Sequence, residues 1–247
     1  MCIIAAKYFD GIGWVGVKNR DRNYIPEISF NRITTNGVEI MLFWDDITKY
    51  CEGINSGGVS VLSASLMVKD DEKEIKVRTK TPSKDGIKIR KALQYPNVKA
   101  VAKSLINDKL PGNTIIFDKE TCYLLEGAWK PGGYKSKQYV YKIREISKHE
   151  YVARTNHGIW LPWAGYQRKQ DSRNQTMSRI SSESRLTIAN HMIPVADSPN
   201  ELLDLLAGTY INNPQLNGLR TTHKQKQMRT TSQIMIIPSE WTLFMRP

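Results

Sequence analysis

Cysteine and histidine are scarce in this chain, with 3 and 4 copies among 247 residues. The cysteines are odd in number and far apart, which fits neither a disulfide framework nor a zinc site. The histidines show no ligand spacing with one another or with the cysteines, so we expect no metal ion and no cofactor. The residues concerned are Cys2, Cys51, Cys122, His149, His157, His191 and His223.

Long apolar runs are also absent. No stretch approaches the roughly 18 consecutive apolar residues that a membrane-spanning helix needs. The first residues lack the basic start and apolar segment of a secretory signal, so we expect a cytoplasmic protein with no membrane partner. Because internal repeats and a clear interdomain linker are missing, we predict one domain over residues 1–247, with a charged excursion around 69–112.

Acidic residues are too few to balance the basic ones: 24 Asp and Glu stand against 36 Lys and Arg, which gives a net charge of +12. Such an excess favours polyanions or acidic substrates as partners. No helix-turn-helix, zinc-finger or RNP-like pattern accompanies the charge, so nucleic acid stays open as a partner without a motif to support it. Hydrophobic residues make up 40% of the chain, enough to form a core.

The first residues, MCIIAAKYFDGIGWVGVKNRD, combine a hairpin pattern with a glycine motif. Apolar, extended segments lie on either side of Asp10-Gly11, which is typical of strand, turn and strand. Gly11, Gly13 and Gly16 also spell G-x-G-x-x-G, but a dinucleotide site needs a helix to open at the third glycine, and no helical pattern follows. We interpret these glycines as a turn and a tight pairing of two strands.

The rest of the chain shows mainly strand patterns, with helical patterns in the middle and near the end. Residues 50–58 are rich in turn formers and are predicted to form a loop. Ser198-Pro199-Asn200-Glu201 has the pattern of a capping box that begins a helix. The predicted strands are 38–46 and 58–68, then the pairs 114–118 with 122–129, 137–146 with 150–155, and 231–238 with 241–245; the other predicted helices are 91–108, broken by Pro96, and 181–193. Segregated antiparallel strands and helices indicate an α+β fold.

Cys2 directly follows the initiator methionine. Removal of Met1 would give Cys2 a free α-amine, whose ordinary pKa is about 7.7–8.0, beside its thiol. That amine can act as general base to the thiol of the same residue, which makes Cys2 a candidate nucleophile. The alternative is a buried thiol that starts an inner strand.

Polar residues at the ends of predicted strands are further candidates. Asn19-Arg20-Asp21 closes the first hairpin, where a carboxylate and a guanidinium could hold an ammonium and position a carbonyl. Asn55, in GINSGG, lies among glycines that let a ligand approach the backbone. Asn156, in ARTNHG, could donate its amide to an oxyanion. Each asparagine also fits an ordinary turn.

The combination of these motifs resembles two groups of proteins. MCIIAAK with KNRD resembles the start of the NRDE proteins, named for Asn-Arg-Asp-Glu, which include the transport-and-Golgi-organisation type. The order of features is also similar to the cysteine N-terminal-nucleophile (Ntn) hydrolases, which include the choloylglycine hydrolases (bile salt hydrolase and penicillin V acylase) and the isopenicillin N acyltransferases. The shared features are an N-terminal Cys, an R-N-x-D-like strand end, a G-x-N-x-x-G loop, a T-N-H turn, an S-S-x-x-R helix start and a closing hairpin.

The resemblance implies a fold and a reaction. The fold is a four-layer αββα sandwich of two antiparallel sheets. The reaction is that of an amidohydrolase or acyltransferase, which attacks a linear, non-peptide or peptide-like amide C–N bond and forms a thioester. The partner is a small-molecule amide or acyl substrate, and the positive charge favours an acidic one. Related hydrolases often assemble, so the resemblance allows a homo-oligomer.

The resemblance also implies roles for single residues. Cys2 is the nucleophile and its α-amine the base. Asp21 holds that amine, with Arg20 beside it. The remaining members of the implied site are Asn55 and Asn156, which stabilise the oxyanion, and Arg185, in SSESR, which supports the site electrostatically.

The chain departs from both groups at two positions. Arg22 stands where the NRDE proteins have Glu. Lys18 stands where the choloylglycine enzymes have Arg, so that either Arg20 replaces that arginine or the site is altered.

Two other functions stay open. A catalytically silent Ntn-fold protein used for binding or interaction predicts that Cys2 does not react with a thiol or acyl probe. A basic nucleic-acid-binding protein predicts binding that collapses as the salt concentration rises. His157 is expected to make structural hydrogen bonds, because an N-terminal nucleophile does not need a histidine base.

Overall fold

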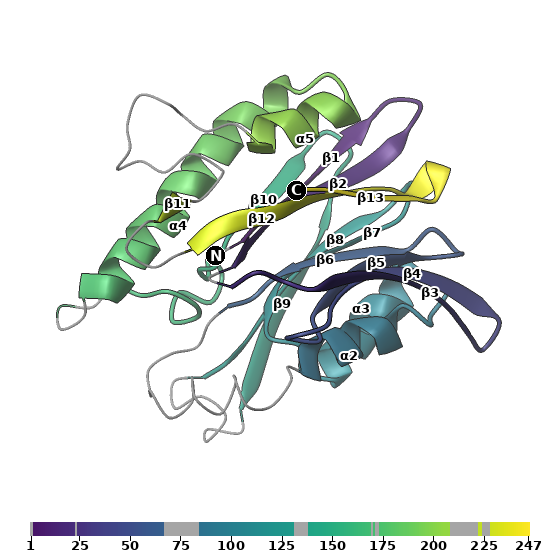
Figure 1. The fold of residues 1–247 in the computed structure, drawn as a ribbon, viewed down its shortest axis with the longest axis horizontal. Helices are drawn as coiled ribbons and strands as arrows, with labels where there is room; N and C mark the ends of the chain where they lie inside the picture. The colour runs from purple at the N-terminus through teal and green to yellow at the C-terminus, as the bar shows by residue number, and fades with distance from the viewer. Residues whose placement is uncertain are drawn as a thin grey trace.

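Two antiparallel β-sheets pack face to face, and helices cover their outer faces (Figure 1). The chain therefore forms a four-layer αββα sandwich. The computed structural model describes residues 2–22, 24–66, 84–130, 138–168, 170, 173–207, 222–223 and 228–247.

Sheet A contains the N-terminal hairpin and has the strand order β10-β1-β2-β12-β11, with β13 also paired to β12. Its strands are β1 (Ile3–Phe9), β2 (Gly13–Arg22), β10 (Tyr151–Arg154), β11 (Thr222–His223), β12 (Met228–Ile237) and β13 (Thr242–Arg246). The β1–β2 and β12–β13 hairpins confirm the predicted pairs at the two ends of the sequence. β1 and β2 are inner strands of sheet A, so most of their residues are buried on both faces, whereas the turn that joins them is exposed.

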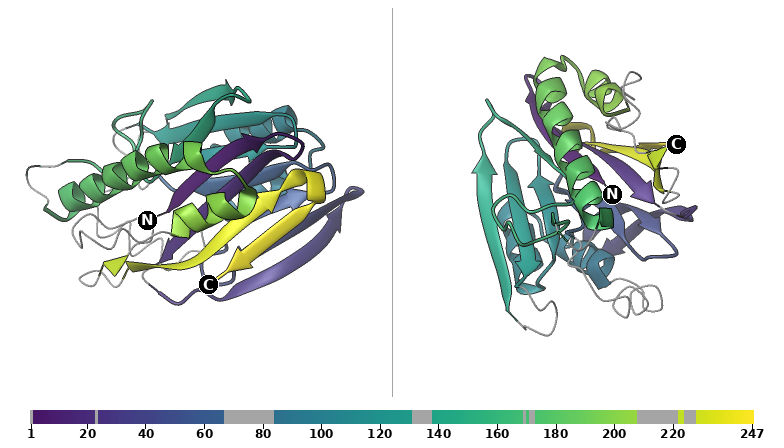
Figure 2. Two further views of the ribbon diagram at one scale, coloured as in Figure 1. Left: turned by 90° about the horizontal axis from the view of Figure 1, so that it is seen from above. Right: turned by 90° about the vertical axis from the view of Figure 1, so that its left-hand side faces the viewer.

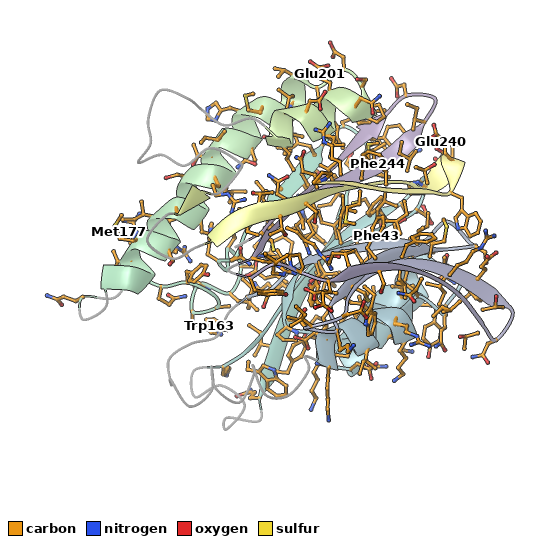
Figure 3. The ribbon with its side chains drawn as sticks, viewed as in Figure 1. Phe43, Trp163, Met177, Glu201, Glu240 and Phe244 are labelled. Carbon is orange, nitrogen blue, oxygen red and sulfur yellow. The ribbon has the colours of Figure 1, made fainter. Side chains whose placement is uncertain are left out.

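Sheet B runs in the order β3-β4-β5-β6-β7-β8-β9. Its strands are β3 (Ile28–Thr35), β4 (Val38–Asp45), β5 (Cys51–Asn55), β6 (Ser60–Ala64), β7 (Gly112–Phe117), β8 (Cys122–Trp129) and β9 (Tyr139–Ile146). The β7–β8 hairpin was predicted. Apolar side chains from both sheets, such as Phe43 in Figure 3, fill the space between them.

Helices lie on both outer faces, as Figures 1 and 2 show. They are α2 (Lys84–Ala92), α3 (Val98–Asn107), α4 (Arg173–Met192) and α5 (Pro199–Ala207), with 3-10 turns η2 (Ile193–Val195) and η4 (Pro238–Glu240). α2 and α3 pack on sheet B, whereas α4 and α5 pack on sheet A. Met177 of α4 points away from the sheets and is exposed (Figure 3).

One helix prediction is confirmed and another is corrected by the structure. The capping box of α5 is confirmed, because Glu201 N donates to Ser198 Oγ at 3.2 Å and the Glu201 carboxylate accepts from Asp197 N. The helix predicted over 91–108 is two helices that are separated around Pro96, and the first begins at Lys84. Of the charged excursion predicted around 69–112, residues 69–83 lie outside the described residues, whereas 84–112 contain α2, α3 and the first residue of β7.

Two strand predictions were wrong. Residues 51–55, expected in a loop, form β5 in the middle of sheet B; Gly53 sits so close to the neighbouring strand that a Cβ would lie 2.3 Å from the Met41 carbonyl oxygen. Segments 137–146 and 150–155 were expected to pair with each other. Instead β9 pairs with β8 in sheet B, and β10 pairs with β1 in sheet A. The chain crosses between the sheets there, so two strands adjacent in sequence are not partners.

Candidate active site

Cys2 directly precedes β1 and faces the space between the sheets. Side chains alternate along a strand, so Ile3 packs toward the helices while Cys2 and Ile4 pack toward sheet B. The Cys2 residue is 6% exposed. Its thiol therefore lies at the N-terminal end of an inner strand, enclosed by the two sheets.

The same alternation places Lys18 and Arg20 of β2 on the inner face, beside β1. Both side chains are fully buried, and both pair with the Glu52 carboxylate of β5. Lys18 Nζ contacts Glu52 Oε1 and donates to the Ser63 carbonyl at 2.6 Å, while Arg20 Nη2 lies 2.7 Å from Glu52 Oε2. Burial raises the pKa of Glu52, but Arg20 and Lys18 more than offset it and hold that pKa below its ordinary value.

Arg22, two residues further along β2, reaches Cys2 itself. Its Nη1 donates to Cys2 Sγ at 3.4 Å. Its Nε donates to the Tyr24 hydroxyl at 3.1 Å and lies 3.6 Å from Asp45 Oδ2. The Tyr24 hydroxyl in turn donates to Asp45 Oδ2 at 2.5 Å, so the Nε atom of the guanidinium is engaged by two groups while Nη1 contacts the sulfur.

These cations change the acidity of the Cys2 thiol. Burial alone raises its pKa, but the charges of Lys18, Arg22 and the N-terminal ammonium together outweigh burial and lower the pKa to about 7. The other two thiols behave oppositely, because burial raises the pKa values of Cys51 and Cys122. Cys2 is therefore the thiol with substantial thiolate at neutral pH.

Asn156 holds the backbone nitrogen of Cys2. Its Oδ1 accepts from Cys2 N, and its Nδ2 donates to the Ser65 carbonyl at 2.7 Å. Its own backbone N–H donates to Ser182 Oγ at 3.2 Å. The amide oxygen thus faces the nitrogen that Met1 removal would free, whereas donation to an oxyanion would need Nδ2.

Asp21 and Arg185 meet on the other face of sheet A. Asp21 Oδ2 lies 2.8 Å from Arg185 Nη1 of α4, and Asp21 Oδ1 accepts from Thr230 Oγ1 at 2.8 Å. The Asp21 charge raises the pKa of Cys2, in opposition to the neighbouring cations. The pair therefore lies next to the thiol while facing the helix layer.

The structure does not bring Asn55 to this site. Asn55 faces α2 and α3, on the outer side of sheet B. Its Nδ2 donates to the carbonyls of Leu93 and Tyr95 at 2.9 and 2.7 Å, and its Oδ1 accepts from Val59 N at 2.9 Å. These bonds join the end of β5 to the α2–α3 connection. Both Asn55 amide hydrogen-bonding groups therefore have structural partners on the outer face of sheet B, away from Cys2.

His157 makes hydrogen bonds of the expected structural kind. Its Nδ1 lies 2.8 Å from Ser182 Oγ and 3.0 Å from Thr155 Oγ1. Burial, with Arg179 nearby, lowers the pKa of His157 to about 4, so the ring is neutral at pH 7. It links the segment after β10 to α4.

Sequence reasoning missed several members of the site. Arg22 and Glu52 were not assigned roles, and Lys18 was noted only as a departure. The signal was present, because Lys18, Arg20 and Arg22 recur with the period of two that places three cations on one face of β2. The five candidates Cys2, Arg20, Asp21, Asn156 and Arg185 gather around the start of β1 and the end of β2.

No three His, Cys, Asp or Glu side chains in the described part of the chain are placed to hold a metal ion together. None of the helices within the described ranges has the length and apolarity to cross a membrane.

Solved structures that share this fold include a conjugated bile acid hydrolase and a penicillin V acylase. The C2A mutant of conjugated bile acid hydrolase from Clostridium perfringens has a TM-score of 0.59 and 12% sequence identity, over 100% of this chain and 89% of that chain. Penicillin V acylase from Agrobacterium tumefaciens has a TM-score of 0.52 and 11% identity, over 99% of this chain and 82% of that chain. Neither a protein-family model nor a curated protein matches the sequence. The predicted α+β sandwich, and the resemblance to these enzymes at the level of the fold, are confirmed.

Proposed function

We propose that the chain is a cysteine N-terminal-nucleophile amidohydrolase that cleaves a linear amide C–N bond in a small N-acyl substrate. One observation carries the proposal: Cys2 lies at the start of an inner strand with its backbone nitrogen on Asn156 and its thiol beside Arg22. The fold, shared with a bile acid hydrolase and a penicillin acylase, supports it.

The first half of the reaction forms a thioester. Removal of Met1 frees the Cys2 α-amine, which takes the thiol proton, and the sulfur attacks the amide carbon. The C=O electron pair moves to oxygen and gives a tetrahedral oxyanion. When that pair returns, the C–N bond breaks, and the Cys2 ammonium gives its proton to the leaving amine.

The second half releases the acyl group. A water molecule gives one proton to the Cys2 α-amine and attacks the thioester carbon. The C–S bond then breaks, the Cys2 ammonium returns its proton to the departing sulfur, and the products are a carboxylic acid and the free thiol. An incoming amine in place of water gives acyl transfer, which is the second form of the same proposal. The cations Lys18, Arg20 and Arg22 outnumber the carboxylates Glu52 and Asp45 that pair with them, and this excess favours an acidic substrate.

The experiment has two stages. The intact mass of the purified protein is measured first, because retention of Met1 blocks the amine and removes the mechanism. The protein is then assayed against a panel of N-acyl amino acids and neutral N-acyl amines, with release of the amine as the readout. We expect turnover by the chain without Met1, and faster turnover of the acidic members.

The matched variants are Cys2→Ala and Cys51→Ala. Both remove one buried thiol, but only the first removes the proposed nucleophile. We expect Cys2→Ala to abolish turnover and the covalent acyl adduct, and Cys51→Ala to keep both. Equal activity of the two variants would contradict the proposal, and no turnover across the panel by protein that lacks Met1 would favour a catalytically silent protein.

A further inference from the structure

Arg22 stands apart from the other two cations of β2. Lys18 and Arg20 share the Glu52 carboxylate inside the sandwich. Arg22 instead directs Nη1 at the sulfur of Cys2, at 3.4 Å, and donates to the Asp21 carbonyl at 2.9 Å. Among the described residues, Arg22 is the one whose side chain forms a hydrogen bond with the Cys2 sulfur.

Contacts with Tyr24 and Asp45 fix the position of the Arg22 guanidinium. Tyr24 and Asp45 engage the Nε edge of the guanidinium, and Asp45 Oδ1 accepts from Ile47 N and Thr48 N at 3.1 and 3.2 Å. The Asp45 carboxylate is thus anchored to a turn of sheet B. The Arg22 side chain is 14% exposed, so its charge is only partly screened by solvent. A charged group held this way keeps one orientation toward the sulfur.

Resting on the proposed function, we infer that Arg22 is a catalytic residue whose guanidinium is the counter-ion that keeps the Cys2 sulfur as a thiolate. In this step the S–H bond breaks and its electron pair stays on sulfur. The proton passes to the Cys2 α-amine, or to water when that amine is blocked. Arg22 keeps its own protons throughout, and Nη1 donates to the anionic sulfur.

Other charges also act on this thiol, and the mutational test must take them into account. Lys18 favours ionisation of the thiol, and Asp21 opposes it. The titratable groups that interact with Cys2 are the N-terminal ammonium, which also favours ionisation, Lys18, Asp21 and Arg22 of β2, Tyr50 next to β5, and Tyr166 after β10. The test must therefore change the charge at position 22 and leave these groups in place.

The test is the pH dependence of Cys2 alkylation by iodoacetamide in the folded protein, read at the Cys2 peptide by mass spectrometry. Arg22→Lys, Arg22→Gln and Arg22→Glu give charges of +1, 0 and −1 at this one position. Arg144→Gln, which removes an exposed cation from β9, is the control for net charge. Circular dichroism and urea unfolding confirm that each variant is folded.

We expect the midpoint of alkylation to follow the charge at position 22. It should stay near pH 7 in the unaltered protein and in Arg22→Lys, rise by about 1 to 3 pH units in Arg22→Gln, and rise further in Arg22→Glu. At pH 7 a rise of 1 in the pKa leaves about fivefold less thiolate. Arg144→Gln should leave the midpoint unchanged.

An unchanged midpoint in folded Arg22→Gln would overturn the inference, as would an equal rise in Arg144→Gln. A rise in Arg22→Lys as large as in Arg22→Gln would also overturn it, because the charge would then not be the cause. The assay reads the thiol and needs no substrate. Failure of the amidase proposal therefore shows in the substrate panel, and failure of this inference shows in the alkylation profile.

Discussion

Asp21 and Arg185 form an ion pair that joins sheet A to helix α4, with 2.8 Å between Oδ2 and Nη1 and both side chains fully buried. Removal of one partner leaves the other charge buried without its counter-ion, which typically costs about 3–5 kcal/mol. We expect Arg185→Met and Asp21→Asn each to lower the free energy of unfolding by this amount. Urea denaturation followed by circular dichroism measures the loss.

A double-mutant cycle separates the pair from its surroundings. Asp21→Asn with Arg185→Met should lose less than the sum of the single variants, because no unpaired charge remains. The exposed pair Arg144–Glu150, at 2.9 Å, is the control, and Arg144→Gln should cost no more than about 1 kcal/mol. If Arg185→Met lowered the free energy of unfolding as little as Arg144→Gln, the conclusion that Asp21 and Arg185 form a stabilising buried ion pair would be contradicted.

Glu52 should make stability depend on acid pH. Its folded-state pKa lies below the ordinary value of 4.5, since Arg20 and Lys18 outweigh burial. A depressed carboxyl pKa stabilises the fold above about pH 4.5, and that stability is lost as pH falls through the folded-state pKa. We expect Glu52→Gln to be less stable than the unaltered protein at pH 7, and the difference to shrink toward pH 3. A difference that is constant with pH would refute this role.

His157 should contribute a second acid-sensitive step, at higher pH. Its pKa falls from 6.5 to about 4 in the fold, so the unfolded chain binds the extra proton first. Stability should therefore decline as pH drops from 6.5 to 4, by roughly 3 kcal/mol from this group. His157→Gln should flatten the curve of unfolding free energy against pH in this window and leave the slope below pH 4 unchanged. An exposed histidine, His149, offers the matched control His149→Gln.

Substitution of Gly16 tests whether this glycine of the G-x-G-x-x-G motif is needed for close packing between the sheets. A Cβ on Gly16 would lie 2.2 Å from Phe117 Cζ and 2.8 Å from Leu62 Cδ1, in the space between the sheets. Gly16→Ala should therefore cost about 1–3 kcal/mol of unfolding free energy through overpacking. Phe117→Leu makes room, so the double variant should lose less than the sum of the two single losses. Strict additivity would contradict the packing explanation.

Local patterns predicted the parts of the fold that depend on neighbours in sequence. The Asp10-Gly11 turn and the capping box of Ser198 and Glu201 are examples, because turn and cap chemistry act within a few residues. β5 was missed because its buried Glu52 and its Gly53 look like loop residues until Lys18 and Arg20, from the other sheet, are placed beside them. A strand whose polar residues find partners far away in sequence cannot be recognised by hydrophobic alternation.

The site shows the same limit. The bond between Cys2 and Asn156 joins positions 154 residues apart, and no spacing in the sequence encodes that distance. Asn55 carried an equally suggestive motif, yet its strand turns it toward α2 and α3. Whether an asparagine can reach Cys2 depends on the face of the sheet that its side chain occupies. The face of Asn55 could not be assigned while its segment was predicted to be a loop.

Cys2 should be the cysteine that reacts selectively in the native protein. Burial opposes its ionisation, but Lys18, Arg22 and the N-terminal ammonium lower its pKa to about 7, whereas burial raises the pKa values of Cys51 and Cys122 above 9.0. We expect iodoacetamide at pH 7 to label Cys2 alone, and all three cysteines in urea, as read by peptide mass spectrometry. Labelling of Cys51 or Cys122 in folded protein at the rate of Cys2 would contradict this. Because alkylation follows the thiolate, the rate at Cys2 should be half-maximal near pH 7.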